Sequence, residues 1–252
     1  MATSLSNIAF TVTQPVYSTN YPTEFLVYNG SYCSGQNGGQ CCYWVAPAGT
    51  SWVTFEIWGG GGGGGGSCCC QSGSGGGAGA YSVKSVCTGT TGGLAGQGYT
   101  ICAGSTTFAT PYCTGCPGYV SYVNGYGLSN FCAQGGCQSI STCWQYFSCY
   151  TGCNMICCMS SACGGDITMP GYSGGELQTQ FCGAKAQGFA AVAPATVSGP
   201  WTGPHGCQWG GCTSWGTGPY FPGGGGRPGI GSANNCCCGE YGGGGLVSIT
   251  YG

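Results

Sequence analysis

The segment Ser51-Trp52-Val53-Thr54-Phe55-Glu56-Ile57-Trp58 carries the strongest strand signal of this 252-residue chain, and an unbroken glycine tract follows it at Gly59–Gly66. Val53, Phe55 and Ile57 alternate with the other residues of the segment and would face one side of a strand. The residues just before it, 47–50, read Pro-Ala-Gly-Thr and are typical of a turn. We therefore predict a half-buried β-strand that ends where the glycine tract begins.

Further strands are predicted along the chain. They are rich in β-branched and aromatic residues and are bounded by Gly and Pro, at residues 8–13, 24–28, 80–86, 98–102, 118–123 and 246–251. In the last of them, Val247, Ile249 and Tyr251 share one side. The best helix candidate, residues 143–159, lacks capping residues and contains Gly152. The fold class is therefore predicted to be mainly β.

The composition indicates a folded, cross-linked chain. It contains 57 glycines and 24 cysteines, yet only 3% of its residues are charged. A net charge of −2 and 13% aromatic residues argue against charge-driven disorder. Glycine loses much backbone entropy on folding, and disulfides would offset that loss. So little charge gives little colloidal repulsion, which favours an oligomer or a larger assembly.

Several functional classes are disfavoured by the same numbers. Three Lys and Arg residues cannot neutralise a phosphate backbone, so no nucleic-acid partner is expected. The single histidine, His205, removes most catalytic and zinc sites that use imidazole. No apolar run is long enough for a transmembrane helix, and the first 14 residues lack the pattern of a signal peptide. Neither a paired carboxylate spacing nor a phosphate-binding glycine motif is present. We expect a non-enzymatic protein without a cofactor or a bound metal.

The glycine tracts have two interpretations. They lie at Gly59–Gly66, Gly75–Gly77, Gly223–Gly226 and Gly242–Gly245. One interpretation is a flexible linker. The other is ordered packing, because glycine backbones can approach one another very closely. The first tract is flanked by Trp58 and by Cys68-Cys69-Cys70, which favours ordered packing.

The cysteines also allow two interpretations, a disulfide framework or a metal site. Cys113 and Cys116 form a C-x₂-C pair, but no second pair of matching spacing completes a four-ligand site. Disulfides are therefore favoured, with candidates at Cys68, Cys69, Cys70, Cys113, Cys116, Cys236, Cys237 and Cys238. Both cysteine triplets sit beside glycine tracts, which suggests that they pair with each other.

The chain divides by composition into two parts. Residues 1–30 contain no cysteine and one glycine, and form either an N-terminal arm or edge strands. Residues 31–252 form a glycine- and cysteine-rich β domain with a loop-rich middle at about 111–235. In that middle, turn-forming residues alternate with large aromatic residues, which are good contact residues when exposed. The candidates for receptor contact are Trp201, His205, Trp209, Trp215, Tyr220 and Phe221; the alternative is that these side chains fill a core.

Three motifs follow one another along the chain. They are the Val45–Thr50 opening with its strand into Gly59–Gly66, the tract that leads into Ala80-Tyr81, and the tract that leads into Leu246–Tyr251. In this order they resemble the glycine-rich domain of phage tail-fibre and tail-tip proteins. The resemblance covers about residues 43–110 and 236–252. It departs from the family in the cysteine content, and the middle of the chain has no counterpart.

The resemblance implies a β-sandwich-like base that carries packed glycine segments, often in a trimer or another repeated fibre tip. It implies a virion-surface protein that associates with other virion subunits and recognises a glycan or protein on the host surface. A virion protein would also meet oxidising surroundings after host lysis, which suits disulfides without a signal peptide. The alternatives are a purely structural virion decoration or coat protein, and an enzyme acting on surface polysaccharide.

Overall fold

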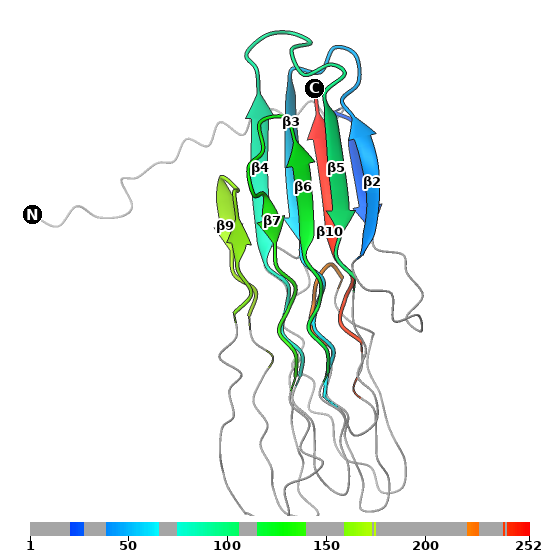
Figure 1. Cartoon of the computed structure of the whole chain (residues 1–252), viewed down its shortest axis with the longest axis vertical. Coiled ribbons are helices and arrows are strands. Elements are labelled where there is room, and N and C mark those ends of the chain that lie inside the picture. Colours follow the sequence, from blue (N-terminus) through cyan, green and yellow to red (C-terminus); the bar gives the residue numbers. More distant parts are fainter. Residues whose placement is uncertain are drawn as a thin grey trace, which may run out of the picture.

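The computed structural model describes residues 21–27, 39–65, 75–105, 115–139, 159–172, 174, 221–226, 239 and 241–252. Within them, strands form two antiparallel five-stranded sheets that lie face to face (Figure 1), so the fold is mainly β as predicted. The first sheet has the order β1-β10-β3-β4-β9 and the second β2-β5-β6-β7-β8. The bounds are β1 Thr23–Val27, β2 Gln40–Val45, β3 Trp52–Trp58, β4 Tyr81–Cys87, β5 Gly98–Ala103, β6 Ser121–Gly125, β7 Cys132–Ala133, β8 Ala162–Cys163, β9 Ile167–Met169 and β10 Leu246–Tyr251.

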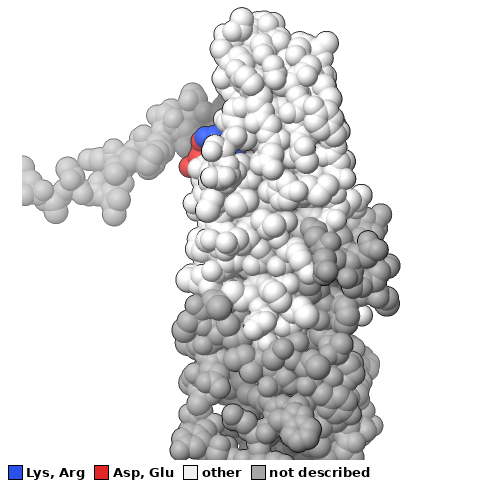
Figure 2. Space-filling view, in the orientation of Figure 1, with Lys and Arg blue, Asp and Glu red and all other residues white. Residues whose placement is uncertain are grey.

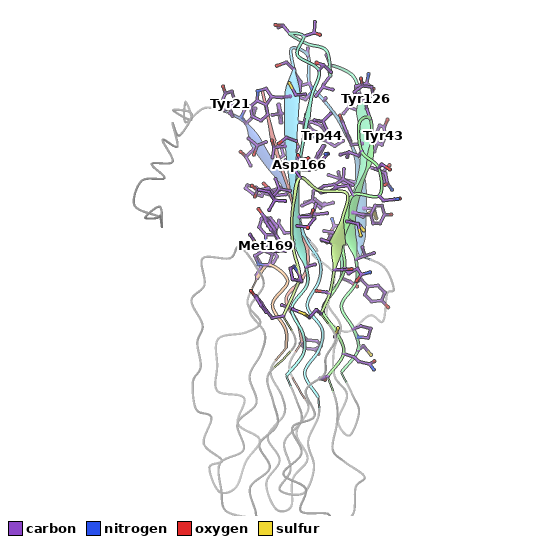
Figure 3. All side chains as sticks on the ribbon, turned by 90° about the vertical axis from the view of Figure 1, so that its left-hand side faces the viewer. Tyr21, Tyr43, Trp44, Tyr126, Asp166 and Met169 are labelled. Carbon is purple, nitrogen blue, oxygen red and sulfur yellow. A yellow bond between two sulfur atoms is a disulfide. The ribbon has the colours of Figure 1, made fainter. Side chains whose placement is uncertain are left out.

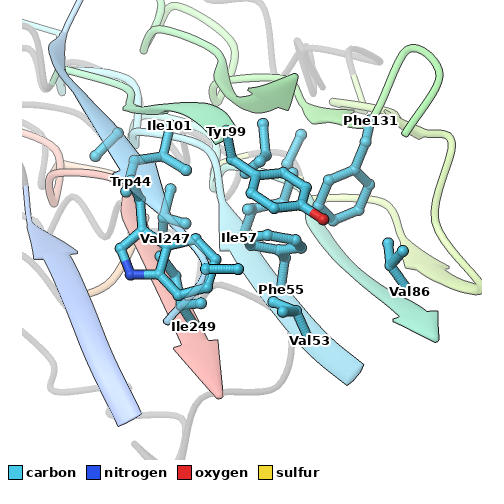
Figure 4. Close-up of a cluster of buried hydrophobic side chains, with 14 of the residues drawn as sticks. Trp44, Val53, Phe55, Ile57, Val86, Tyr99, Ile101, Phe131, Val247 and Ile249 are labelled. Atoms are coloured by element: carbon cyan, nitrogen blue, oxygen red, sulfur yellow. The ribbon is translucent and has the colours of Figure 1, made fainter. Parts of the chain in front are cut away.

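The core lies between the two sheets (Figure 4). Val53, Phe55 and Ile57 of β3 are completely buried there, which confirms the predicted inward face of this strand. Tyr99 of β5 and Phe131, which directly precedes β7, are also completely buried. Aromatic pairs connect the two layers. The ring centroids of Phe55 and Tyr99 are 5.0 Å apart, and Trp44 and Phe55 meet in the favoured edge-to-face geometry.

The last strand of the chain is central to the first sheet. β10 lies between β1 and β3, and pairs along its whole length with β3. Val247 and Ile249 enter the core, as their alternation predicts, and Tyr251 packs against it. Residues from both described ends of the chain therefore complete the same layer.

The predicted strands at 24–28, 80–86, 98–102 and 246–251 match β1, β4, β5 and β10 within two residues. The strand predicted at 118–123 is corrected, because β6 begins only at Ser121. Before that point, the N–H groups of Gly118 and Tyr119 bond to Gly136 and Ser105, outside any ladder. The prediction at 8–13 lies outside the described residues, and the described part of the chain holds no helix able to span a membrane.

Candidate functional site

Below the sheets, the chain continues as extended glycine-rich segments that run in the direction of the strands (Figure 1). The N–H groups of the segment that follows β3 bond in turn to different neighbours: Gly59 to Ala80, Gly60 to Tyr119, Gly61 to Gly243, Gly62 to Gly77, and Gly63 to Cys116. The partner segment thus repeats every three residues. Three residues per turn is the period of the polyproline II helix, which has no internal hydrogen bonds and must bond to its neighbours.

The segment after β3 is surrounded on all sides by backbone. Besides the three segments that accept its N–H groups, it lies against residues 104–105, 134–137 and 223–226. A Cβ atom on Gly59, Gly60 or Gly61 would overlap a carbonyl oxygen of Gln134, Ser105 or Gly224. We call this assembly the glycine bundle; its described residues are 59–65, 75–80, 104–105, 115–120, 134–139, 171–172, 174, 223–226 and 241–245.

Several segments of the glycine bundle run away from the sandwich, and all of them do so at the same end of it. Descending segments leave the described part after Gly65, Ser105, Ser139, Gly174 and Gly226. Ascending segments return at Gly75, Gly115 and Gly239, beside the distal part of the segment that follows β3. The sequences that join these ends include the aromatic-rich middle of the chain. This end of the bundle is the candidate functional site.

Most of the predicted receptor-contact residues lie outside the described residues, namely Trp201, His205, Trp209, Trp215 and Tyr220. Phe221 is described, and its side chain is 48% exposed. It precedes Gly223, whose carbonyl accepts the N–H of Gly79 near the start of β4. Phe221 therefore lies at the sandwich end of the bundle, away from the distal part.

The predicted disulfide candidates are also mostly outside the described residues. Cys68, Cys69, Cys70, Cys113, Cys236, Cys237 and Cys238 fall there, and Cys116 is described. The segments that flank the two triplets meet, because Gly239, directly after Cys238, packs on the backbone of Gly64. The pairing of the triplets remains a prediction.

The described disulfide joins Cys41 of β2 to Cys102 of β5, which are register partners. Sequence analysis did not single out this pair. Its one available signal was the Cys41-Cys42 doublet before an aromatic run, but the partner is set by strand register over a separation of 61 residues.

Charged groups are scarce on the described surface. Figure 2 shows one face of the molecule, on which basic and acidic atoms lie together at one edge. Lys84 forms an ion pair with Asp166, and its hydrogen bond lowers the pKa of the Asp166 carboxyl, helped by the N–H of Ser85. Glu56 lies on the outer face of the first sheet, where burial raises the pKa of its carboxyl. Neither arrangement pairs two carboxylates.

The described residues contain no group of three or more potential ligands that could hold a metal ion. The metal interpretation of Cys113 and Cys116 lies partly outside the described residues, because only Cys116 is described. No protein-family model and no curated protein sequence matches the chain.

Proposed function

We propose that this chain is a non-enzymatic phage virion protein, a tail-fibre or tail-tip subunit that recognises the host surface. The observation that carries the proposal is the set of descending segments that leave the glycine bundle on one side of the sandwich. A rigid base from which several connections extend is how binding loops are commonly held. These connections include Trp201, Trp209 and Trp215.

The glycine bundle suits this role because it forms a support with almost no side chains. Each segment is fixed by hydrogen bonds to several others, so the positions at which connections leave are set by backbone geometry. Large aromatic side chains on such connections would give contact area at a low entropic cost. A glycan or a protein on the host surface is the proposed ligand.

The sparse charge of the chain supports assembly with other virion subunits. Only 3% of all residues are charged, so desolvating a contact surface costs little. We propose a homo-oligomer on the virion surface, with a trimer favoured by the family resemblance, and exposure to the medium after lysis. The competing function is a purely structural virion protein without a receptor.

Competition for adsorption tests the proposal. Purified protein added before infection should lower the adsorption of phage carrying this chain to its host, in proportion to the dose. The Trp201→Ala/Trp209→Ala/Trp215→Ala variant should lose most of this effect while keeping the wild-type melting temperature. The matched control is Tyr126→Ala, because Tyr126 is 51% exposed at the opposite end of the sandwich (Figure 3).

Two results would overturn the proposal or its choice of contact residues. Wild-type protein that fails to compete would leave the purely structural role. Competition that survives the triple substitution would remove these tryptophans from the binding surface. Release of reducing sugar from host polysaccharide would instead indicate an enzyme.

A further inference from the structure

Five residues form one line across the second sheet, each being the register partner of the next. They are Cys41 of β2, Cys102 of β5, Tyr122 of β6, Cys132 of β7 and Cys163 of β8. Their strand neighbours Ile101, Val123 and Ala133 are buried in the core, so alternation turns this line toward the outer face. We call this line the sulfur row.

The two halves of the sulfur row differ in their covalent state. Cys41 and Cys102 are joined, with Cα atoms 4.1 Å apart, and the Tyr122 hydroxyl lies 4.0 Å from the Cys41 sulfur. On the other side of Tyr122, Cys132 and Cys163 face each other as thiols. Cys132 and Cys163 thus lie in the same row as Cys41 and Cys102, at the opposite edge of the sheet.

The backbone ladder fixes the spacing of the second pair. The Val123 N–H donates to the Phe131 carbonyl at 3.1 Å. Because pair types alternate along an antiparallel ladder, the next pair, Tyr122 and Cys132, is not hydrogen-bonded. The backbone groups of Cys132 then point toward β8, and a hydrogen-bonded pair has its Cα atoms about 5.5 Å apart. That Cα spacing falls within the usual range for a disulfide. The side chains of a hydrogen-bonded pair stand farther apart than those of the other pair type, so the bond also requires the two short strands to bring the Cβ atoms of Cys132 and Cys163 closer together.

The two thiols differ in exposure. Cys163 is exposed, whereas Cys132 is partly buried. Burial raises the pKa of the Cys132 thiol, and the neighbouring Cys163 adds to the effect. Since the thiolate is the nucleophile, Cys163 is the thiol that reacts first with a reagent in solution.

We propose that Cys132 and Cys163 are the site of a second cross-strand disulfide, formed by exchange with a small disulfide such as oxidised glutathione. The Cys163 thiolate attacks one sulfur of that reagent, which forms a mixed disulfide and releases one glutathione. Cys132 then loses its proton to solvent and attacks the Cys163 sulfur, which releases the second glutathione. Two protein thiols are oxidised, and one small disulfide is reduced to two thiols.

This bond would act on the weakest part of the second sheet. β7 and β8 have two residues each, and β8 is an edge strand. Both strands adjoin the glycine bundle, where Gln134 and Ser160 bond to neighbouring backbone. The bond would therefore hold together the strand that precedes residues 140–158 and the strand that follows them.

Counting thiols by intact mass tests the proposal. Full-length protein is incubated with oxidised glutathione, denatured in the presence of N-ethylmaleimide, and weighed. If the disulfide forms, the Cys132→Ser and Cys163→Ser variants each gain, relative to wild type, one thiol that is either alkylated or carries a glutathione adduct, because the partner is released and has no second cysteine to resolve the mixed disulfide. Both adducts are counted by their mass. The double variant returns to the wild-type count. The control Cys87→Ser, at an exposed thiol outside the row, loses one.

Two patterns would overturn the proposal. A loss of one thiol in each single variant and of two in the double variant would mean that both cysteines stay reduced. A gain of two thiols in the double variant would mean that each cysteine pairs elsewhere. If a serine variant fails to fold, peptic mapping of the wild-type protein at low pH decides the matter, by finding or not finding a peptide pair linked through Cys132 and Cys163.

Discussion

At Gly61, replacing one hydrogen by a methyl group would be enough to disturb the glycine bundle. The added Cβ would overlap the Gly224 carbonyl oxygen, which is backbone and cannot rotate away. Gly61→Ala should therefore lower the free energy of unfolding by about 1–3 kcal/mol, as measured by chemical denaturation. The matched control is Gly98→Ala, whose Cβ would first meet the hydroxyl end of Tyr43, a side chain that is 70% exposed and can move. Equal losses in both variants would contradict this account.

Tyr99 carries a hydroxyl that finds no hydrogen-bond partner among the described residues, although the side chain is completely buried. A buried polar group left unpaired costs about 1–3 kcal/mol, so Tyr99→Phe should raise the melting temperature or leave it unchanged. Tyr251→Phe is the control, because the Tyr251 hydroxyl donates to Glu24 at 3.0 Å. That variant should melt at a lower temperature, and the reverse order of the two variants would refute the assignment.

Glu56 should make stability depend on pH. Across the ladders it faces Val83 and Ser248, and burial raises the pKa of its carboxyl above the usual value. The folded protein thus holds this proton more tightly than the unfolded chain. The resulting stability is fully present below the unfolded pKa and is lost as the pH rises through the folded one.

Glu56→Gln should accordingly stabilise the protein at pH 7, by less than about 1 kcal/mol, and the gain should vanish in acid. Denaturation curves of both proteins between pH 3 and 8 measure the difference. Glu24→Gln serves as the control. The Glu24 carboxylate accepts hydrogen bonds from Trp44 and Tyr251, so this substitution should lower the stability at pH 7. A gain from Glu56→Gln that does not change with pH would rule out the proposed cause.

At the scale of elements, the glycine segments should behave as ordered structure in solution. The N–H groups of Gly59–Gly63 are all bonded to carbonyls of other segments, and these glycines are buried. Hydrogen exchange there should be slowed at least about a hundredfold relative to an unstructured peptide. The exposed turn at residues 89–91 provides a fast-exchanging control within the same digest. Exchange of the glycine peptide as fast as that turn would restore the linker interpretation.

The elements that sequence could predict are those with a signal of their own. β3 and β10 alternate cleanly, so their inward faces could be read from Val53 to Ile57 and from Val247 to Ile249. β7, β8 and β9 have two or three residues, which is too few for a periodic pattern. They form because their backbones can hydrogen-bond to a neighbouring strand. β2 was missed because Cys41 and Cys42 carry no strand signal. The sulfur row was beyond reach, since it depends on the register of strands far apart in sequence.

At the scale of the whole molecule, two halves are held together by different forces. The sandwich depends on buried side chains such as Phe55 and Phe131, which remove apolar surface from water. The glycine bundle has almost no side chains to bury, and depends on hydrogen bonds between backbones at very close approach. The strands are continuous with the glycine segments, so each half sets the alignment of the other (Figure 1).

The threefold repeat of hydrogen-bond partners in the bundle also restricts how such a protein can change in length. Deleting one glycine would turn the rest of its segment by a third of a revolution and direct each N–H toward the wrong neighbour. Removing or adding three residues keeps every direction, and shifts the end by about 9.3 Å, three times the helical rise. A descending segment and the ascending segment that returns beside it must change together. The length of the glycine bundle can therefore change in evolution only in units of three residues.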